Sequence, residues 1–396
     1  MRRVRFAAPS GLLLLTGARV ALANFRFARG RQGHFTLRHA DERMRTELGW
    51  LGIDWDAIGE PGDHAGAIEH LKSTGRLYPC FESEIELRAK REHRIKRGRS
   101  AVYDRAMLKL TPEQRAAAEA GGKRPYWRFR LSPRIVTWID PINGRGEAKL
   151  PAVSDPVLVT AEGVAAAALT AVVDDAADGI THVIQADEGE GTIGIHIDLS
   201  QALGHDPAAL TFARLPVLGG TGRLAVRSLR NDGIEAEALA SWLDCGERFN
   251  IRNLLSIPEP ETLPAVNRAL LARRDFASVA DRLPPGATEP FWLAVRGHID
   301  LLTEARHWWD VVNGTIFPPV PAGAARLAQE GRRVLPEEPW EGGTWKAWLD
   351  AIPVDASLDN AMLLRLLLTG EEQGPSLVSL LPLIGRARVL ERLSGA

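Results

Sequence analysis

Cysteine is scarce in this sequence, because its 396 residues include only Cys80 and Cys245. Two cysteines so far apart form neither a disulfide framework nor a CxxC metal pair, which favours a reducing cytoplasm and gives no support for zinc. Long apolar runs are also missing, since no stretch approaches the roughly 18 residues of a membrane helix. The leucines at 12–15 follow three N-terminal arginines, but Arg19 ends that run too early for a secretion signal. We therefore expect a cytoplasmic protein with no membrane partner.

Net charge is close to zero, with 49 Lys and Arg residues against 50 Asp and Glu residues, so the total identifies no partner. A nucleic-acid-binding protein would need its basic residues gathered on one face. Residues 88–99 (RAKREHRIKRGR) are one such cluster, with the basic side chains Arg88, Lys90, Arg91, Arg94, Lys96, Arg97 and Arg99. An isolated cluster of this kind is more often a solvated helix face, and phosphate binding is the alternative.

The order of apolar and polar segments predicts an α/β protein of more than one domain. Residues 4–8 and 34–40 are typical of strands, and the helix predicted between them over 18–30 ends at a glycine, an arrangement that favours a parallel sheet. Residues 44–56 predict an amphipathic helix. Between residues 76 and 150, apolar and polar residues alternate as in antiparallel strands. The α/β pattern then resumes, and from about Glu235 onward the sequence predicts an all-α region.

Three glycines, Gly189, Gly191 and Gly194, form a GxGxxG between a predicted strand and a predicted helix. This is the context of a dinucleotide-binding fingerprint. The acidic residue that would hold the ribose about 20 positions later is missing, and a lone GxGxxG has many false positives. A dinucleotide-dependent oxidoreductase is therefore the least favoured interpretation of this chain.

One pair of acidic residues is a candidate for general acid and base catalysis. Asp174 and Asp175 have the residue type of a general acid and base, but at a strand end such residues are more often turn or helix-cap residues. His182 in a predicted strand and His196 in a predicted helix fit structural roles. No histidine lies at a metal-ligand spacing beside the acidic residues of this region, so we expect no metal site.

Several segments, taken in order, resemble the glutamyl-tRNA synthetases, which are class I aminoacyl-tRNA synthetases. The matching segments are VRFAAPSG, GARVALANFRFARGRQGHFTLR, WLGIDWD, GRLYPCFES, VYDR, WRFRL, SDPVLV, AVVDDAADGITHVIQAD and RLLLTGEEQGPSLVSLLPLIGRARVLERL. The resemblance implies a Rossmann-type catalytic domain that is split by an acceptor-stem-binding insert and followed by a helical anticodon-binding domain. The implied boundaries are 1–75 and 151–245 for the two catalytic halves, the second including a stem-contact region, 76–150 for the insert and 246–396 for the helical domain.

The resemblance also implies an activity, in which glutamate is activated by ATP with Mg²⁺ and then attached to tRNA, namely tRNA-Glu, by a monomeric enzyme. Such chemistry depends on positioning and on stabilising the charge of the transferring phosphoryl group, so the family's signature motifs are polar and cationic. Within this family the basic cluster at 88–99 falls in the insert, where it becomes a candidate for contacts with tRNA phosphates.

The sequence departs from the family at the ATP-binding motifs. The family's HIGH tetrapeptide aligns with residues 14–17 (LLTG), so a leucine without any donor replaces the histidine that meets the ATP phosphates. The loop before it is one residue shorter, although the backbone amides after its glycine could still cradle phosphate. The KMSKS-type lysine loop is missing, since LPVLGGTG passes directly into RLAVRSLRNDGIE. The remnants of the implied ATP site are Ser10, Gly11, Thr16, Gly17 and Arg223.

The implied glutamate pocket is altered as well. The family's tyrosine aligns with Ala167, its carboxylate-binding arginine with Gln185, and an acidic residue after the second strand with Ala40. A neutral amide cannot replace a charged bidentate fork. The remnants of the implied amino-acid site are Arg5, Asp41 and Gln185.

Loss of one transition-state donor can lower a rate about 100- to 1,000-fold, and several are lost here. The sequence therefore predicts a degenerate synthetase with lost or severely weakened catalysis and no catalytic residue that is clearly retained. A working glutamate-tRNA ligase is what the likeness alone implies, and a non-catalytic tRNA-binding paralogue is the alternative.

Overall fold

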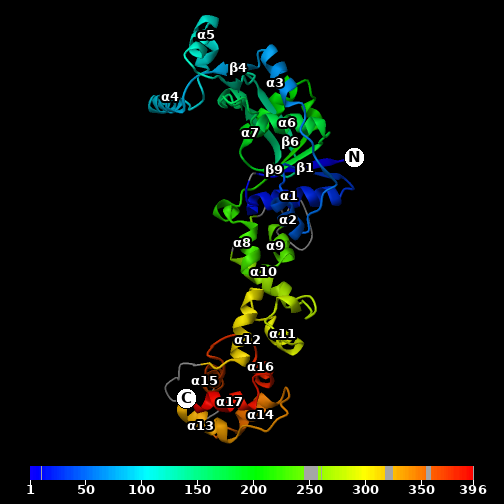
Figure 1. The fold of residues 1–396 in the computed structure, drawn as a ribbon, viewed down its shortest axis with the longest axis vertical. Coiled ribbons are helices and arrows are strands. Elements are labelled where there is room, and N and C mark those ends of the chain that lie inside the picture. Colours follow the sequence, from blue (N-terminus) through cyan, green and yellow to red (C-terminus); the bar gives the residue numbers. More distant parts are fainter. Residues whose placement is uncertain (10, 245–256, 260, 317–323, 354–357, 396) are drawn as a thin grey trace. The chain divides into compact units, whose positions relative to one another are not determined.

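The computed structural model describes residues 1–9, 11–244, 257–259, 261–316, 324–353 and 358–395, as traced in Figure 1. The chain forms two compact units, Met1–Val226 with Leu243–Pro258, and Arg227–Trp242 with Glu259–Ala396. The boundary predicted after residue 245 lies outside the described residues. Among the described helices, none is long and apolar enough to cross a membrane.

The first unit is organised around parallel strands, as the sequence predicted. They are β1 (Arg3–Ala7), β2 (His34–Arg38), β3 (Ala57–Ile58), β9 (His182–Ala186) and β10 (Thr211–Leu215). β2 pairs with both β1 and β3, and β9 pairs with β10, all in parallel. The backbone amide of Thr181 donates to the carbonyl of Arg3 at 2.9 Å, which links the β9 segment to β1. Val4, Phe35, Leu37 and Val183 are buried, because helices cover both faces of such a sheet.

The helices of this α/β region connect the strands. They are α1 (Leu15–Arg29), α2 (Glu42–Trp50), α3 (His64–Ser73), α6 (Ala167–Ala177) and α7 (Glu190–Ala202). α1 begins three residues before the predicted start and ends at Gly30, as predicted. α2 is shorter than the helical stretch expected over 44–56, because Gly52, at φ +72°, turns the chain just after Trp50.

The insert between the two α/β halves is antiparallel, which confirms the predicted alternation. β4 (Leu77–Cys80), β5 (Tyr126–Phe129) and β8 (Val157–Val159) form one sheet, and β6 (Ile135–Asp140) and β7 (Gly144–Lys149) form a hairpin. Two helices, α4 (Glu84–Lys96) and α5 (Pro112–Ala120), belong to this region. α4 begins with a capping box, in which Ser83 and Glu86 satisfy each other's backbone amides.

Close packing accounts for the glycine pattern at 189–194. Gly189 precedes α7 with φ +97°, a conformation that favours glycine. Gly194 lies inside α7, where an added Cβ would be only 2.6 Å from the Cβ of Ala148 and 3.0 Å from Leu150. The turn before α7 and its close approach to the β6–β7 hairpin therefore account for this glycine pattern. No bound dinucleotide is needed to explain it.

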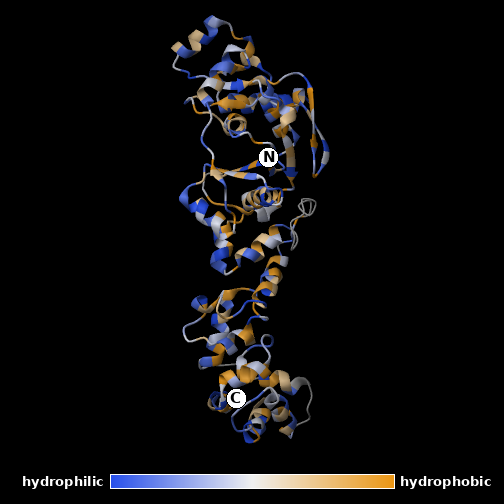
Figure 2. Cartoon of the chain, turned by 90° about the vertical axis from the view of Figure 1, so that its right-hand side faces the viewer, coloured by the Kyte–Doolittle hydropathy of each residue, from blue (hydrophilic) through white to orange (hydrophobic). Residues whose placement is uncertain are grey.

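The second unit is helical, as predicted. Its helices are α8 (Val226–Asp232), whose first residue closes the first unit, α9 (Ala236–Leu243), α10 (Thr262–Leu271), α11 (Glu289–Val295), α12 (Ala305–Asn313), α13 (Ala324–Arg333), α14 (Thr344–Ala351), α15 (Leu358–Thr369), α16 (Leu377–Ile384) and α17 (Arg386–Ser394). Phe291, Trp292, Trp348 and Leu380 are fully buried in its core. Figure 2 shows hydrophobic and hydrophilic residues on the same helices, as amphipathic packing requires.

Candidate active site

The segment that aligns with the first ATP motif packs directly against the start of α8. The amide of Leu15 donates to the carbonyl of Leu224, and the amide of Val226 donates to the carbonyl of Leu13, both at 2.9 Å. Between them, Leu14 and Ala225 form an antiparallel bridge. The side chains of Leu13 and Leu15 are fully buried. Backbone pairing and apolar burial therefore hold residues 13–16 and 222–226 together.

Thr16 and Gly222 complete this contact. The Thr16 hydroxyl donates to the Gly222 carbonyl at 3.3 Å, and a Cβ at position 222 would collide with that hydroxyl. Only residues 216–225 connect β10 to α8, and their one basic side chain, Arg223, is exposed. The connection is thus too short to carry a separate lysine loop.

Two other predicted remnants of the ATP site flank the contact. Gly17 lies in the first turn of α1, where an added Cβ would meet Leu13 at 3.5 Å. Gly11 adopts φ +100°, so a glycine suits this turn. Ser10 lies outside the described residues. The roles of these residues toward ATP remain predictions.

Arg5 forms a buried ion pair inside the protein. Its Nε and Nη2 donate to the two carboxylate oxygens of Asp175 at 3.0 and 3.2 Å, and Nη1 of Arg38 donates to the same carboxylate at 2.8 Å. Burial would raise the pKa of Asp175, but the arginines outweigh it and hold that pKa below its usual value. The guanidinium fork predicted to face an amino-acid carboxylate is therefore engaged by an internal one.

Asp174 and Asp175 lie inside α6, so the interpretation of them as turn or cap residues was wrong. Both side chains are 1% exposed, and Asp174 accepts hydrogen bonds from the amide of Gly62 at 2.8 Å and the ring of His64 at 2.6 Å. The available signal was Arg5 on a buried strand, because a buried guanidinium needs a carboxylate partner. The sequence could not place that partner on a helix 170 residues away.

His196 lies beside this cluster and is neutral at pH 7. Burial lowers its pKa to about 4, and the charge of Asp175, with its Oδ2 3.8 Å from the ring Nε2, only partly opposes that effect. Among the described residues, Nε2 has no hydrogen-bond partner. The ring packs edge-on against Phe212, with centroids 5.2 Å apart, which agrees with the structural role expected for it.

The other predicted amino-acid-site residues make local contacts. The Asp41 carboxylate caps α2 by accepting from the amide of Met44 at 2.8 Å. Gln185 lies on β9, in register with Arg214 of β10. Ala167 is the first residue of α6 and is exposed. The contacts of Arg5 and Asp41 are thus with separate partners, and their roles toward an amino acid remain predictions.

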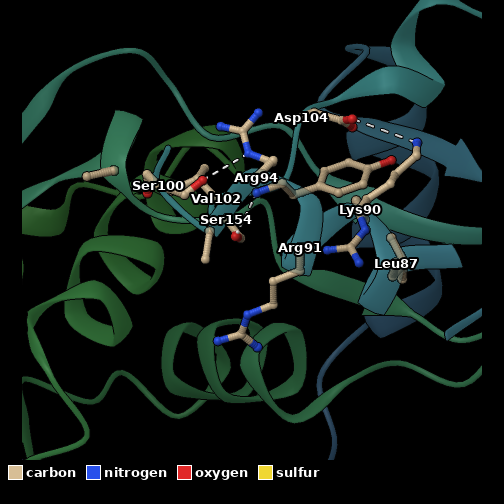
Figure 3. Close-up of a pocket in the computed structure, with 12 residues that line it drawn as sticks. Leu87, Lys90, Arg91, Arg94, Ser100, Val102, Asp104 and Ser154 are labelled. Atoms are coloured by element: carbon tan, nitrogen blue, oxygen red, sulfur yellow. Dashed lines mark hydrogen bonds and ion pairs between the residues drawn. The ribbon is translucent and has the colours of Figure 1, made fainter. Parts of the chain in front are cut away.

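The basic cluster divides into two groups. Lys90, Arg91 and Arg94 line a cavity of about 490 Å³, together with Arg128 from β5. Figure 3 labels Lys90, Arg91 and Arg94 of α4 among the lining residues, with Arg94 beside Ser100 and Ser154. The remaining four basic residues are exposed and do not line it: Arg88, Lys96, Arg97 and Arg99. Arg128 was missed at the sequence level, because it comes from a strand distant in the chain.

Sequence comparison matches two families to this chain. The family described as tRNA synthetases class I (E and Q), catalytic domain, matches residues 2–219, and the anticodon binding domain family matches residues 358–396. A protein named "Glutamate--tRNA ligase 2" from Granulibacter bethesdensis is 45% identical, over 100% of this chain and 98% of its own. The protein of the same name from Gluconacetobacter diazotrophicus is 43% identical, over 99% of both chains.

These two alignments extend over 441 and 437 positions, whereas the chain has 396 residues. The relatives therefore contain internal residues that have no counterpart here. Among solved structures, the glutamate-tRNA synthetase of Elizabethkingia anophelis superposes with a TM-score of 0.74 at 20% identity, and 99% of each chain is covered. At that identity the likeness concerns the fold, an α/β catalytic domain followed by a helical anticodon-binding domain. From the family matches and the full-length relatives, the chain belongs to the glutamyl-tRNA synthetase family of class I aminoacyl-tRNA synthetases.

Proposed function

We propose that this chain is a cytoplasmic glutamate-tRNA ligase homologue that still binds tRNA, while its ATP-dependent activation of glutamate is lost or severely weakened. One observation carries the proposal, namely the direct contact between residues 13–16 and 222–226. By the family resemblance, these two segments hold the places of the two ATP motifs. Here they bind each other.

The contact uses the groups that a triphosphate would need. Phosphoryl transfer depends on donors and cations aimed at phosphate oxygens. The Leu14 side chain has no donor, and both the Leu15 amide and the Thr16 hydroxyl donate to carbonyls of the facing segment. Opening the contact would also expose Leu13, which is fully buried together with Leu15. ATP would therefore have to break protein hydrogen bonds and expose apolar surface before it gained any contact.

The same residues do not fit Mg²⁺. This ion binds through oxygen ligands, usually one or two carboxylates together with substrate phosphates. Within the described part of the chain, no group of three His, Cys, Asp or Glu residues could hold a metal ion. The segment at 13–16 offers one side-chain oxygen, that of Thr16, and it is already used. We therefore derive no catalytic step through ATP and Mg²⁺ in this chain.

Glutamate recognition is weakened for a related reason. A carboxylate substrate is held best by a bidentate guanidinium, but the fork of Arg5 already holds Asp175. Gln185 stands where the family has its arginine, and Ala167 stands where it has its tyrosine. A glutamate ligand would have to displace a buried internal carboxylate, which is unfavourable because Asp175 would lose both hydrogen bonds from Arg5.

Retention of tRNA binding is supported by the parts of the chain outside that contact. The insert presents a helix with seven basic residues in and after it, five of them exposed, and such charge attracts nucleic-acid phosphates. The helical unit includes the match to an anticodon binding domain. The relatives are named for ligation of glutamate to tRNA, so we propose tRNA-Glu as the RNA partner.

A second candidate function is an active glutamate-tRNA ligase, which uses ATP, glutamate and tRNA-Glu. It is favoured by identities of 43–45% over essentially the whole chain to proteins of that name. The two candidates differ in one measurable step, the formation of glutamyl-adenylate.

ATP–pyrophosphate exchange with glutamate, measured with and without tRNA-Glu, decides between them. The Granulibacter relative, assayed in parallel, provides the reference rate. We expect exchange at least about 1,000-fold slower than that reference, since more than one donor is missing and each can contribute 100- to 1,000-fold. A rate within about tenfold of the reference would refute the loss of activation.

A single substitution tests whether the closed contact is the obstacle. Leu14→His returns a ring donor to the first motif but leaves residues 222–226 in place. We expect this variant to remain inactive in exchange. Recovery of activity through this one change would show that the missing ring, rather than the contact, blocks activation.

tRNA binding needs its own measurement, because it can persist without catalysis. Gel shifts of tRNA-Glu at several salt concentrations should show binding whose logarithmic affinity falls linearly with the logarithm of the salt concentration. An absent shift, or one that salt does not alter, would contradict the RNA-binding part of the proposal.

A further inference from the structure

The cavity between α4 and the segment 100–104 has an unusual balance of charge. Four cationic side chains line it, from Lys90, Arg91, Arg94 and Arg128, against one anionic side chain, that of Asp104. Lys90 is neutralised locally, because it pairs with the buried carboxylate of Glu82 and lies 3.7 Å from Asp104. The positive charge that faces the cavity therefore belongs to the three arginines.

None of these arginines has a carboxylate partner among the described residues. Nε of Arg94 donates to the carbonyl of Ser100 at 2.9 Å, and Nη1 of Arg128 donates to the carbonyl of Asp155 at 2.6 Å. Both partners are neutral carbonyl groups, so the two guanidinium charges are held in place without being neutralised. Arg91 extends from the exposed side of the same helix turn and lines the same cavity.

The cavity wall is held by a hydrogen-bonded network around Tyr103. Its amide donates to the Ser154 hydroxyl at 3.0 Å, and its own hydroxyl donates to Glu82, the carboxylate that also pairs with Lys90. The guanidinium of Arg128 lies over the Tyr103 ring, 4.3 Å from its centroid. Because these contacts and the two carbonyl hydrogen bonds fix Arg94 and Arg128 before any ligand arrives, ordering these two side chains would cost little on binding.

We propose that this cavity is a phosphate-binding site, formed by Arg91, Arg94 and Arg128. Planar guanidinium groups match the geometry of phosphate oxygens and remain charged at all physiological pH values. A volume of about 490 Å³ admits a whole nucleotide as well as a single phosphate group. The phosphate comes from a nucleic-acid strand or from a free nucleotide. Only the choice of RNA as the first source rests on the proposed retention of tRNA binding.

The RNA arm of the test compares two charge-neutralising substitutions on one helix. Arg91→Gln removes a cavity charge, while Arg88→Gln removes an exposed charge of α4 that does not line the cavity. Filter binding of a tRNA-Glu transcript to the full chain is measured at several salt concentrations. For Arg91→Gln we expect at least about fivefold weaker binding and a salt slope reduced by about one, as loss of one phosphate contact requires. The control should change the affinity less than twofold.

The free-nucleotide arm uses AMP and inorganic phosphate as probes. Their binding to the wild-type chain and to both variants is measured by calorimetry. If a free nucleotide is the source, AMP binds the wild type and the Arg88→Gln control alike, Arg91→Gln abolishes the signal, and the two variants bind RNA equally. Arg91→Lys, which keeps the charge but loses the fork, should fall between wild type and Arg91→Gln in whichever arm responds.

The site is refuted if Arg91→Gln and Arg88→Gln behave alike in both arms, because the cavity would then contribute nothing beyond surface charge. Failure of the proposed function would give results that can be told apart from failure of this site. Rapid ATP–pyrophosphate exchange leaves this result unaffected, and a wild-type chain that binds no tRNA still leaves the AMP arm to decide on the cavity.

Discussion

Asp175→Asn is the substitution that most directly tests what holds the catalytic unit together. The carboxylate is 1% exposed and receives three hydrogen bonds from Arg5 and Arg38. The amide keeps the shape but removes the negative charge, which leaves two buried guanidinium groups facing a neutral partner. Breaking a buried pair in this way costs about 3–5 kcal/mol. Arg38 keeps a second carboxylate, Asp178, so we expect the lower end, about 3 kcal/mol.

Hydrogen exchange followed by mass spectrometry measures this loss locally, which suits a chain of two units. A destabilisation of about 3 kcal/mol corresponds to exchange that is faster by about 150-fold in peptides from β1, β2 and α6. Asp54→Asn is the matched control, because its side chain is 76% exposed and pairs with Arg29 at the surface. Surface pairs of this kind contribute about 0–1 kcal/mol. Acceleration below about fivefold for Asp175→Asn would refute the stabilising role of the cluster.

The pH dependence of the same difference has a defined sign. The folded protein holds the pKa of Asp175 below its usual value, so the stabilisation is fully present above the unfolded pKa near 3.9 and is lost as the pH falls further. The difference between wild type and Asp175→Asn should therefore be constant at neutral pH and shrink below about pH 4. A difference that persists unchanged under more acidic conditions would contradict the ion-pair explanation.

Gly194→Ala should destabilise the first unit by about 1–3 kcal/mol in urea unfolding, because its methyl would lie 2.6 Å from the β6–β7 hairpin; Gly191→Ala, with ordinary contacts, should be tolerated. Burial depresses the pKa of His196 in the folded protein to about 4, so the wild type should lose about 3 kcal/mol of stability through this group as the pH falls from 6.5 to 4. His196→Gln should not show this loss. Urea unfolding of both proteins across this pH range checks the prediction, and the same dependence of stability on pH in wild type and variant would contradict it. Gly222→Ala should be less destabilising in a Thr16→Ala background than alone, because the hydroxyl that its methyl would meet is then gone. A double-mutant cycle should give a coupling of about 1 kcal/mol or more, and simple additivity would refute the contact.

Local pattern was sufficient for most of the elements. The apolar strand at 4–8, the helix that ends at Gly30 and the alternating strands of the insert are encoded by neighbouring residues, so hydrophobic period and a terminal glycine predict them. The shortened α2 shows the limit of that reasoning. Its apolar period continues to 56, but a glycine at positive φ ends the helix first.

The site depends on pairs that are distant in the sequence, and periodicity has no information about them. Arg5 meets Asp175 across 170 residues, and Thr16 meets Gly222 across 206. The motif comparison predicted which residues had changed. It could not predict that the altered segments would bind each other, because that depends on how the short connection after β10 returns to α1.

The basic cluster also shows which features the sequence predicts and which depend on the fold. Sequence alone identified seven basic residues, but the cavity is made by the segment 100–104 and by Arg128, which fold back onto α4. Lys90 has the same charge as its neighbours, but it is paired with Glu82 and Asp104. Charge counted along the chain therefore overstates the number of groups that are available to a phosphate.

The anchors of the insert bear on the proposal that RNA binding is retained without activation of glutamate. Asp155 is fully buried and accepts from Tyr78, Arg105 and the amide of Leu131. Each of these partners lies within the insert, and none belongs to residues 13–16 or 222–226. The ATP motifs could therefore close onto each other without loosening the framework that holds the arginines of the cavity. Because burial of Leu13 and Leu15 stabilises that closure, substitution at the ATP site would leave a folded scaffold whose phosphate-facing surface is intact.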